Sequence, residues 1–148
     1  MDRADEIAEL LEEAAVLMLR HLTSRQDISL TGASALSRLR REGPLRLTVL
    51  AAGEGVTQPS MTQLIQKLER QGLVRREADP DDGRVALVAI TDAGRELVAQ
   101  RRSARADLLT ALLGTLTPQE AETLGGAAQT ALPLVRRLSE AASARTVN

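Results

Sequence analysis

The sequence predicts a mainly α-helical protein that carries one small β-hairpin. Apolar residues recur at helical spacing on both sides of a glycine turn at Gly55. A segment rich in β-branched and charged residues, with turn residues at its centre, follows from Leu73 to Ile90. A helix pair followed by a charged hairpin is the order of a winged helix-turn-helix, a fold that binds duplex DNA.

The N-terminal part of the chain predicts two helices. Apolar residues recur at helical spacing from Ile7 to Leu22, and acidic residues in the first turn suit the positive end of the helix dipole. A second helix is expected from Thr31 or Gly32 to Glu42, where the Gly43-Pro44 pair ends it.

A tightly crossed helix pair is expected around Ala51 and Gly55. A small residue lets two helices approach closely, and a glycine allows the positive φ of a sharp turn. Glu54, just before the turn, fits an apolar crossing poorly. The side chains expected to be buried there are Leu47, Leu50, Val56, Met61, Leu64, Ile65 and Leu68.

The second helix of the pair is expected from Gln58 to Gln71, with Thr57 as N-cap, Pro59 in the first turn and Gly72 just past the end. Glutamine and threonine can hydrogen-bond base edges, whereas lysine and arginine suit phosphates. The alternative is an ordinary solvated helix face. The outward face carries no acidic residue and consists of Gln58, Pro59, Ser60, Thr62, Gln63, Gln66, Lys67 and Arg70.

The hairpin is expected to form the wing. The run LVRREA predicts a strand, DPDDGR a turn-rich loop, and VALVAI a returning strand that ends before Thr91. Arg84, beside the turn, could enter the minor groove of A·T-rich DNA. Asp82 could hold its guanidinium through a bidentate pair. The alternative is a plain surface turn with a local ion pair.

The C-terminal part predicts two further helices. The first begins after the N-cap Thr91 and reaches about Leu113, and the second begins at a capping box formed by Thr117 and Glu120. Gly125, Gly126 and Pro133 should weaken or kink the last helix, and the tail from Ala141 to Asn148 should fray. The apolar residues of this part exceed what a small winged domain can bury, so a homodimer is expected. They include Leu108, Leu109, Leu112, Leu113, Leu116, Leu124, Leu132, Val135 and Leu138.

Charge and composition point to duplex DNA as the partner. The net charge is −1, but residues 34–76 carry eight basic and three acidic groups, whereas residues 1–33 carry three basic and seven acidic groups. Arg38, just before the helix pair, is a candidate phosphate contact, although charge runs are usually solvated faces. The chain has no Phe, Tyr or Trp, so it lacks the stacking platforms that bind single strands.

The sequence disfavours an enzyme. It has one histidine and no cysteine, and it contains no HExxH, P-loop or GxGxxG motif. His21 lies beside Met18 and Leu22, where packing is the expected role. No cofactor and no metal are expected. No apolar run has the length of a membrane span and the N-terminus is unlike a signal peptide, so a cytoplasmic location without membrane contact is expected.

Four motifs follow one another at a specific spacing: GPLRLTVLA at residues 43–51, GVTQPSMTQLIQKLERQGLVRR at 55–76, DPDDGR at 79–84 and ITDAGREL at 90–97. On these motifs the chain resembles the MarR family of bacterial transcription regulators, which are small dimeric winged-helix proteins. The resemblance implies DNA recognition through Gln58, Pro59, Ser60 and Thr62. The family's Asp-x-Arg wing motif is here Asp82-Gly83-Arg84, whereas Gln63 stands where many relatives place an arginine.

The resemblance also implies a homodimeric repressor that binds an inverted repeat in double-stranded DNA. A small aromatic or hydrophobic acid would release it by entering a crevice between the dimer helices and the winged domain; the alternative is a regulator whose occupancy is set by protein concentration alone. Arg20 and His21 on the first helix are candidate contacts for such an acid, with a surface or interface role as the alternative. One domain, 1–148, is expected, with a DNA-binding core at about 31–91 and dimerisation helices at about 4–24 and 92–140. The alternative function is a helical module whose winged domain binds protein rather than specific DNA.

Overall fold

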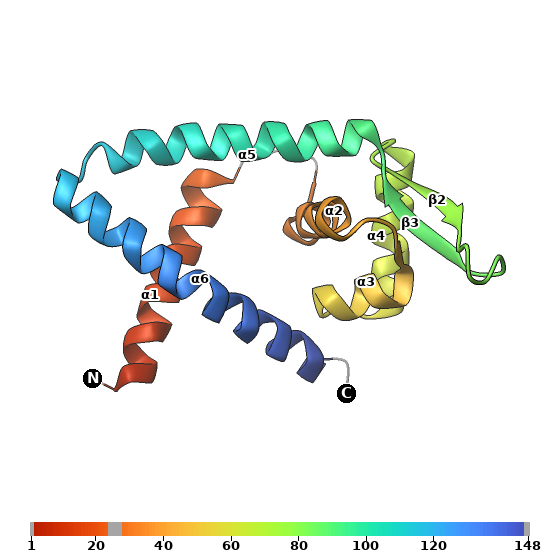
Figure 1. Ribbon diagram of the computed structural model, residues 1–148, viewed down its shortest axis with the longest axis horizontal. Helices are drawn as coiled ribbons and strands as arrows, with labels where there is room; N and C mark the ends of the chain where they lie inside the picture. The colour runs from red at the N-terminus through yellow and green to blue at the C-terminus, as the bar shows by residue number, and fades with distance from the viewer. Residues whose placement is uncertain (1, 24–27, 147–148) are drawn as a thin grey trace.

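The structure is a computed structural model that describes residues 2–23 and 28–146. It is mostly helical, with one small sheet (Figure 1). The elements are α1 (Arg3–Leu17), a π-helical turn η1 (Met18–Leu22), α2 (Leu30–Glu42), β1 (Leu45–Arg46), α3 (Leu47–Glu54), α4 (Gln58–Arg70), β2 (Val74–Ala78), β3 (Ala86–Ile90), α5 (Asp92–Leu113) and α6 (Pro118–Thr146).

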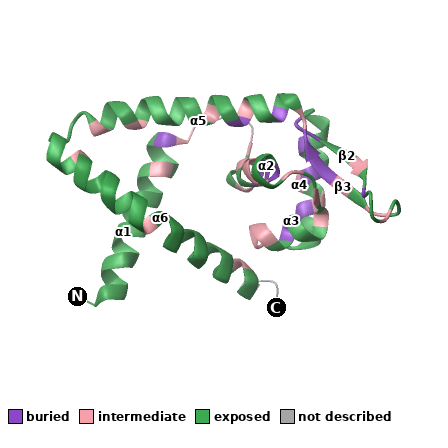
Figure 2. Ribbon diagram, viewed as in Figure 1, coloured by how far each residue is buried: buried purple, intermediate pink, exposed green. Residues whose placement is uncertain are grey.

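The elements divide into two groups along α5. The segment from α2 to β3, which we call the winged unit, gathers at the N-terminal end of α5 (Figure 1). Helix α1 and the beginning of α6 lie below the other half of α5, and the C-terminal part of α6 runs back toward α3 (Figure 1). Figure 2 shows the buried residues concentrated in the winged unit, while α1 and α6 are exposed over most of their length. The hydrophobic core of the chain therefore belongs to the winged unit.

The helix pair forms as the sequence predicts. Leu50 and Ala51 of α3 are buried, and Gly55 adopts a left-handed conformation with φ of 66°. The Thr57 side chain caps α4 by accepting a hydrogen bond from the backbone of Ser60, and Gly72 follows the helix with φ of 73°. Each boundary thus has a local cause in the sequence.

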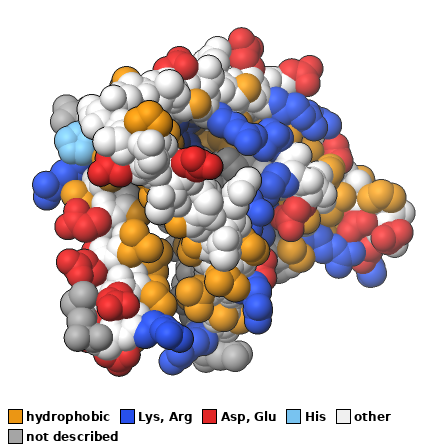
Figure 3. Space-filling model, turned by 60° about the vertical axis from the view of Figure 1, so that its left-hand side comes forward, with side chains coloured by type: hydrophobic (Ala, Val, Ile, Leu, Met, Phe, Trp, Pro, Cys, Tyr) orange, Lys and Arg blue, Asp and Glu red, His pale blue; other side chains and the backbone are white. Residues whose placement is uncertain are grey.

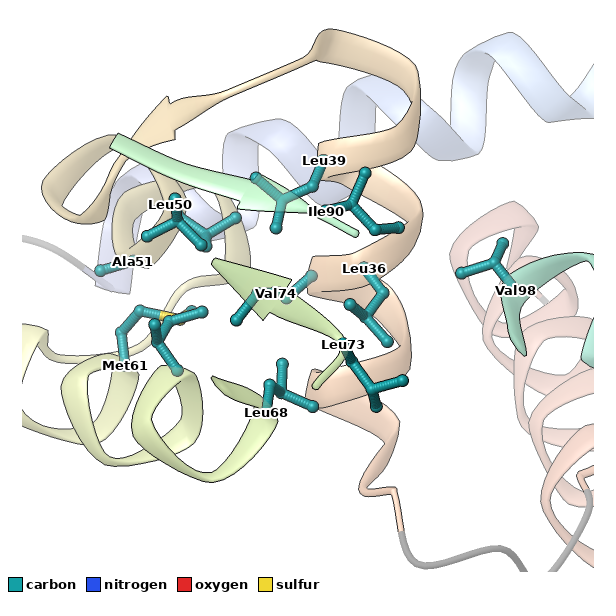
Figure 4. Packing of buried hydrophobic residues seen from close by; sticks show 13 residues of the cluster. Leu36, Leu39, Leu50, Ala51, Met61, Leu68, Leu73, Val74, Ile90 and Val98 are labelled. Atoms are coloured by element: carbon teal, nitrogen blue, oxygen red, sulfur yellow. The ribbon is translucent and has the colours of Figure 1, made fainter. Parts of the chain in front are cut away.

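Aliphatic side chains from every element of the winged unit except β1, together with Val98 of α5, fill the core (Figure 4). The most deeply buried ones come from α2, α3, α4 and β3, and each contributes roughly 1.5–3 kcal/mol through removal from water. The expected residues Leu47, Val56 and Leu64 pack on this core while partly exposed. The fully buried large side chains are Leu36, Leu39, Leu50, Met61, Ile65, Leu68 and Val88.

The sheet has three strands in the order β1-β3-β2, all antiparallel. The hairpin of β2 and β3 matches the prediction, with Val74 opposite Ile90 and Ala78 opposite Ala86. The third strand, β1, was not predicted. Its two residues pair with β3, Leu45 opposite Val88 and Arg46 opposite Leu87, and such a short strand leaves no alternation to detect.

Two predicted helix boundaries were wrong. Helix α2 begins at Leu30, before the predicted Thr31 or Gly32, because the Ser29 hydroxyl accepts a hydrogen bond from the backbone of Gly32 at 3.0 Å. Helix α6 is continuous through Gly125, Gly126 and Pro133 and extends to Thr146.

The predicted fraying of the tail from Ala141 was therefore wrong as far as Thr146, and residues 147–148 lie outside the described residues. The C-terminal part of α6 packs on α3, where the Ser143 hydroxyl donates to the Gly53 carbonyl oxygen at 3.3 Å. At the N-terminal end, a helix was expected at about residues 4–24. In the structure, α1 and η1 together span residues 3–22, and residue 24 lies outside the described residues.

A short junction ties the end of α4 to the start of α5. The Thr91 hydroxyl donates to the Gly72 carbonyl oxygen at 2.6 Å, and the Thr91 backbone N–H donates to the Leu73 carbonyl oxygen at 3.1 Å. A Cβ atom on Gly94 would overlap that Leu73 carbonyl oxygen and the Ile90 side chain. The first turn of α5 can approach this closely because residue 94 has no side chain.

Glu54, which fits an apolar helix crossing poorly, is satisfied by an arginine from α2. The Arg38 Nε donates to Glu54 Oε1 at 2.9 Å, and the Glu54 side chain is only 7% exposed. A second guanidinium nitrogen donates to the Gly53 carbonyl oxygen at 3.0 Å. The hydrogen bond to Glu54 raises the pKa of Arg38 above its usual value, against the opposing effect of burial. Gly53 leaves room for the guanidinium, which a Cβ atom there would contact at 2.9 Å.

We expect the Arg38–Glu54 pair to be important for stability. Glu54→Ala should lower the free energy of unfolding by about 2 kcal/mol, because it removes a charge-assisted hydrogen bond from a largely buried guanidinium. Glu42→Ala is the matched control, since the Glu42 carboxylate is 47% exposed and lies 3.5 Å from Arg38. Its loss should cost less than about 0.5 kcal/mol.

Urea unfolding at fixed protein concentration, followed by far-ultraviolet circular dichroism, measures both changes. Equal losses for Glu54→Ala and Glu42→Ala would contradict a special role for the buried pair.

Candidate nucleic-acid interface

The outward face of α4 presents most of the residues that the sequence singled out. Gln58, Pro59, Ser60, Gln63 and Gln66 are exposed. Met61, Ile65 and Leu68 point into the core from the opposite face. The amphipathic pattern of α4 thus anchors one side of the helix and leaves a polar side free.

Two hydroxyl groups on this face are engaged within the helix. The Thr62 hydroxyl donates to the Gln58 carbonyl oxygen at 2.9 Å, and Thr62 is only partly exposed. The Ser60 hydroxyl accepts from the Thr57 hydroxyl at 2.9 Å. The glutamine amides of the face carry no hydrogen bond in the described part of the chain. They are therefore the groups most available to a ligand.

The last turn of α4 is more mixed in charge than its first turns. Lys67 and Arg70 are exposed there, as predicted from the sequence. Glu69 is exposed as well, and its carboxylate lies 3.7 Å from the Arg76 guanidinium of β2. The acid-free face predicted for α4 is therefore followed by one acid at its C-terminal end, which an arginine of the wing partly neutralises.

The wing holds Arg84 in the bidentate pair that the sequence predicted. Arg84 Nε lies 3.0 Å from Asp82 Oδ1, and its Nη2 lies 3.2 Å from Asp82 Oδ2. The hydrogen bond from the Arg84 side chain, with one from its backbone N–H, lowers the pKa of Asp82. The Arg84 side chain is still 91% exposed. The pair orients the guanidinium without burying it.

A second aspartate anchors the base of the loop. Asp79 is 6% exposed, and its Oδ1 accepts the backbone N–H of Asp81 at 2.9 Å. Arg46 of β1 donates to Asp79 Oδ2 from its Nε at 2.8 Å. The Asp81 N–H, followed by Arg46, lowers the pKa of Asp79. This contact between β1 and the loop was not predicted, since the two residues are far apart in the sequence.

Arg38 lies in a different environment from the one the sequence predicted. Its guanidinium is occupied by Glu54, Gly53 and Glu42, and its side chain is 25% exposed. A guanidinium that is already paired inside the winged unit is poorly placed for a phosphate. We therefore leave Arg38 out of the DNA-binding surface proposed below.

A crevice of about 260 Å³ lies between η1, α2 and α5. Met18, Leu22, Leu30 and Leu108 give it an apolar lining. Arg101 and Arg105 of α5 supply its charge, and Nη1 of Arg101 is buried without a hydrogen-bond partner among the described residues. Arg20 and His21, the candidates from the sequence, are exposed and do not line it. Their neighbours Met18 and Leu22 do, because the π-helical turn places these two toward α5.

The described residues hold neither a metal-binding cluster nor a membrane-spanning helix. No group of three or more histidine, cysteine, aspartate or glutamate side chains is placed to hold a metal ion among them. Within the same ranges, no helix combines the length and the apolar character needed to cross a membrane.

Comparison with known proteins agrees with this architecture. The family model described as MarR family matches residues 28–86, which covers most of the winged unit. The HTH-type transcriptional regulator Mb0904 of Mycobacterium bovis is 38% identical over 138 residues, covering 91% of this chain and 96% of that protein. The regulator ML2140 of Mycobacterium leprae is 39% identical over 117 residues, with 79% and 82% of the two chains covered.

Solved structures share the fold. RV1404 from Mycobacterium tuberculosis superposes with a TM-score of 0.76 at 22% identity, covering 88% of this chain and 95% of that one. The PcaV transcriptional regulator from Streptomyces coelicolor, solved in complex with its natural ligand, gives a TM-score of 0.60 at 25% identity, covering 96% and 97%. With the family match and the near full-length relatives, the chain belongs to the MarR family of HTH-type transcriptional regulators.

Proposed function

We propose that this regulator acts in the cytoplasm as a homodimeric repressor that binds an inverted repeat in duplex DNA. Helix α4 enters the major groove and reads bases through Gln58, Pro59, Ser60, Thr62, Gln63 and Gln66. Lys67 and Arg70 contact phosphates, and Arg84 reaches the neighbouring minor groove. A repressor of this kind blocks transcription of nearby genes by occupying its site.

The observation that carries the proposal is that the chain exposes two surfaces, on α4 and on the wing, that suit different parts of a DNA site. The first turns of α4 expose neutral amides, which can both donate to and accept from base edges. The Arg84 guanidinium is almost fully exposed, yet Asp82 holds it in one orientation. A narrow minor groove attracts such a group because its negative potential is enhanced.

The homodimer is proposed from the apolar residues that one chain leaves uncovered on α1, η1, α6 and the second half of α5. Exposed large apolar residues gather there, and patches of this kind mark association surfaces in soluble proteins. A two-fold dimer would cover them and present two copies of α4. These residues are Ile7, Leu10, Leu11, Val16, Leu17, Leu19, Leu108, Leu112, Leu116, Leu124, Leu132, Leu134, Val135 and Leu138.

A small hydrophobic acid is proposed as the effector, and the crevice between η1, α2 and α5 is its proposed site. An apolar body suits Met18, Leu22 and Leu108, and a carboxylate suits the unpartnered nitrogen of Arg101. PcaV, a transcriptional regulator with a similar fold, was solved in complex with its natural ligand, which supports a ligand for this chain. Release from DNA requires that the acid bind more tightly to an arrangement of the two α4 helices that does not fit the operator.

The first test of the proposal is DNA binding. Fluorescence anisotropy with the chain's own upstream region should reveal an inverted repeat whose half-site centres lie about one helical turn, roughly 10 base pairs, apart. Gln58→Ala should reduce discrimination between the operator and a mutated site by about 1–3 kcal/mol, since a base contact is lost.

Gln100→Ala is the matched control for Gln58→Ala, because Gln100 is exposed on α5 and bonds only to Glu96. It should leave the discrimination unchanged. Failure to bind any upstream fragment at low salt would instead favour a module whose winged domain binds protein.

The wing is tested separately. Arg84→Ala should weaken operator binding chiefly where the flanks are A·T-rich, because narrow minor grooves attract arginine most strongly. Arg145→Ala removes the same charge from an exposed position on α6 and should have little effect. Binding isotherms on operators with A·T-rich and G·C-rich flanks measure the difference. Equal affinities of Arg84→Ala and the unaltered protein would make the wing a surface turn only.

The effector is tested on the preformed protein–DNA complex. Titration with salicylate or benzoate should release the DNA at ligand levels that leave the dimer intact, while uncharged benzyl alcohol should release far less because it cannot pair with Arg101. Gel filtration at the same ligand concentrations checks the dimer. No release by a broad panel of such acids, with no rise in melting temperature, would contradict the effector site.

A further inference from the structure

A second cavity, of about 330 Å³, lies between α2, α5 and α6 and is lined by six arginines. Its remaining lining residues are alanine, leucine, serine and valine, so no acid faces it. Figure 3 shows lysine and arginine side chains gathered in the upper part of one face. We call this space the arginine cavity. Its arginines are Arg40 and Arg41 of α2, Arg101, Arg102 and Arg105 of α5, and Arg136 of α6.

The arginines of the cavity differ in their pairing from three arginines of the winged unit. Arg38, Arg46 and Arg84 each lie within 3.0 Å of a carboxylate oxygen. Among the described residues, no arginine of the cavity forms an ion pair or a hydrogen bond. Six like charges that face one space repel one another unless an anion lies between them.

Two carboxylates border a neighbouring cavity together with two of these arginines. Glu42 and Glu140 line a separate cavity, which Arg41 and Arg136 also border. Glu42 is engaged with Arg38 at 3.5 Å. Those two carboxylates can offset at most part of the charge of Arg41 and Arg136. Four arginines, Arg40, Arg101, Arg102 and Arg105, face no carboxylate in either cavity.

We propose that the arginine cavity binds a small ligand that carries two or more phosphate groups. Guanidinium groups form parallel hydrogen bonds to phosphate oxygens, and several of them are needed to balance a multiply charged anion. The cavity volume falls in the range of small-molecule sites. Nη1 of Arg101, buried without a partner, and the Ser37 hydroxyl on the cavity wall add donors to the same space.

This site overlaps the proposed site of a hydrophobic acid, because both use Arg101. The two cavities share Ala33, Ser37, Arg101 and Arg105, but Arg40 and Arg102 line only the arginine cavity. A ligand there would bridge α2, which belongs to the winged unit, to α5 and α6. Neither α4 nor the wing lines the arginine cavity. The proposal does not rest on DNA binding, and its test uses none.

Isothermal titration of the full-length protein with sodium tripolyphosphate, at constant ionic strength set by sodium chloride, tests the proposal. One saturable site per chain is expected. The double variant Arg40→Gln/Arg102→Gln should weaken binding by about tenfold or more, because each lost guanidinium removes charge-assisted hydrogen bonds. The matched control is Arg137→Gln/Arg145→Gln, which removes the same charge from exposed positions on α6 that line neither cavity.

The control variant should bind tripolyphosphate as the unaltered protein does. Absence of saturable binding, or equal weakening in both double variants, would overturn the proposal. A response to citrate as strong as that to tripolyphosphate would overturn the preference for phosphate groups. If Arg40→Gln/Arg102→Gln dissociates into monomers in gel filtration while the control stays associated, the arginines hold the acidic α1 of a second copy, and the proposal is wrong.

Discussion

The position of α4 depends on the junction at which α4 ends and α5 begins. The Thr91 hydroxyl and backbone N–H hold the carbonyl oxygens of Gly72 and Leu73, and Gly94 allows the first turn of α5 to pack directly on that backbone. These short contacts join the two helices directly. In the proposed dimer, the spacing of the two α4 helices would follow the arrangement of the α5 helices.

A second link connects the opposite side of the winged unit to α6. The Gly53 carbonyl oxygen accepts hydrogen bonds from Arg38 of α2 and from Ser143 of α6. This carbonyl lies just before the turn of the helix pair, so the end of the last helix contacts the element that positions α4. The winged unit is held between α5 at one side and the end of α6 at the other. Either helix provides a route by which a bound ligand could alter DNA binding.

Charge in this molecule is divided between paired and unpaired groups. Three arginines of the winged unit are paired with a carboxylate: Arg38 with Glu54, Arg46 with Asp79 and Arg84 with Asp82. The arginine cavity has no such compensation among the described residues. The same residue type therefore occurs in two settings, since the pairs stabilise the winged unit locally while the uncompensated cluster leaves positive charge in one cavity.

The sequence by itself determined the features that depend on neighbours along the chain. Caps such as Thr57, Thr91 and Thr117, the positive φ of Gly55 and the local pair of Asp82 with Arg84 follow from residues within a few positions of one another, so propensity and spacing suffice to predict them.

The tertiary structure alone decided what depends on residues far apart: the third strand β1, the partner of Glu54, the anchoring of α6 through Ser143 and the convergence of arginines from three helices. The sequence around an arginine on a helix face is the same whether its guanidinium meets solvent, a carboxylate or another arginine. Only the packing of the helices brings its partner within reach, and that is why the sequence did not reveal that Arg38 pairs with Glu54.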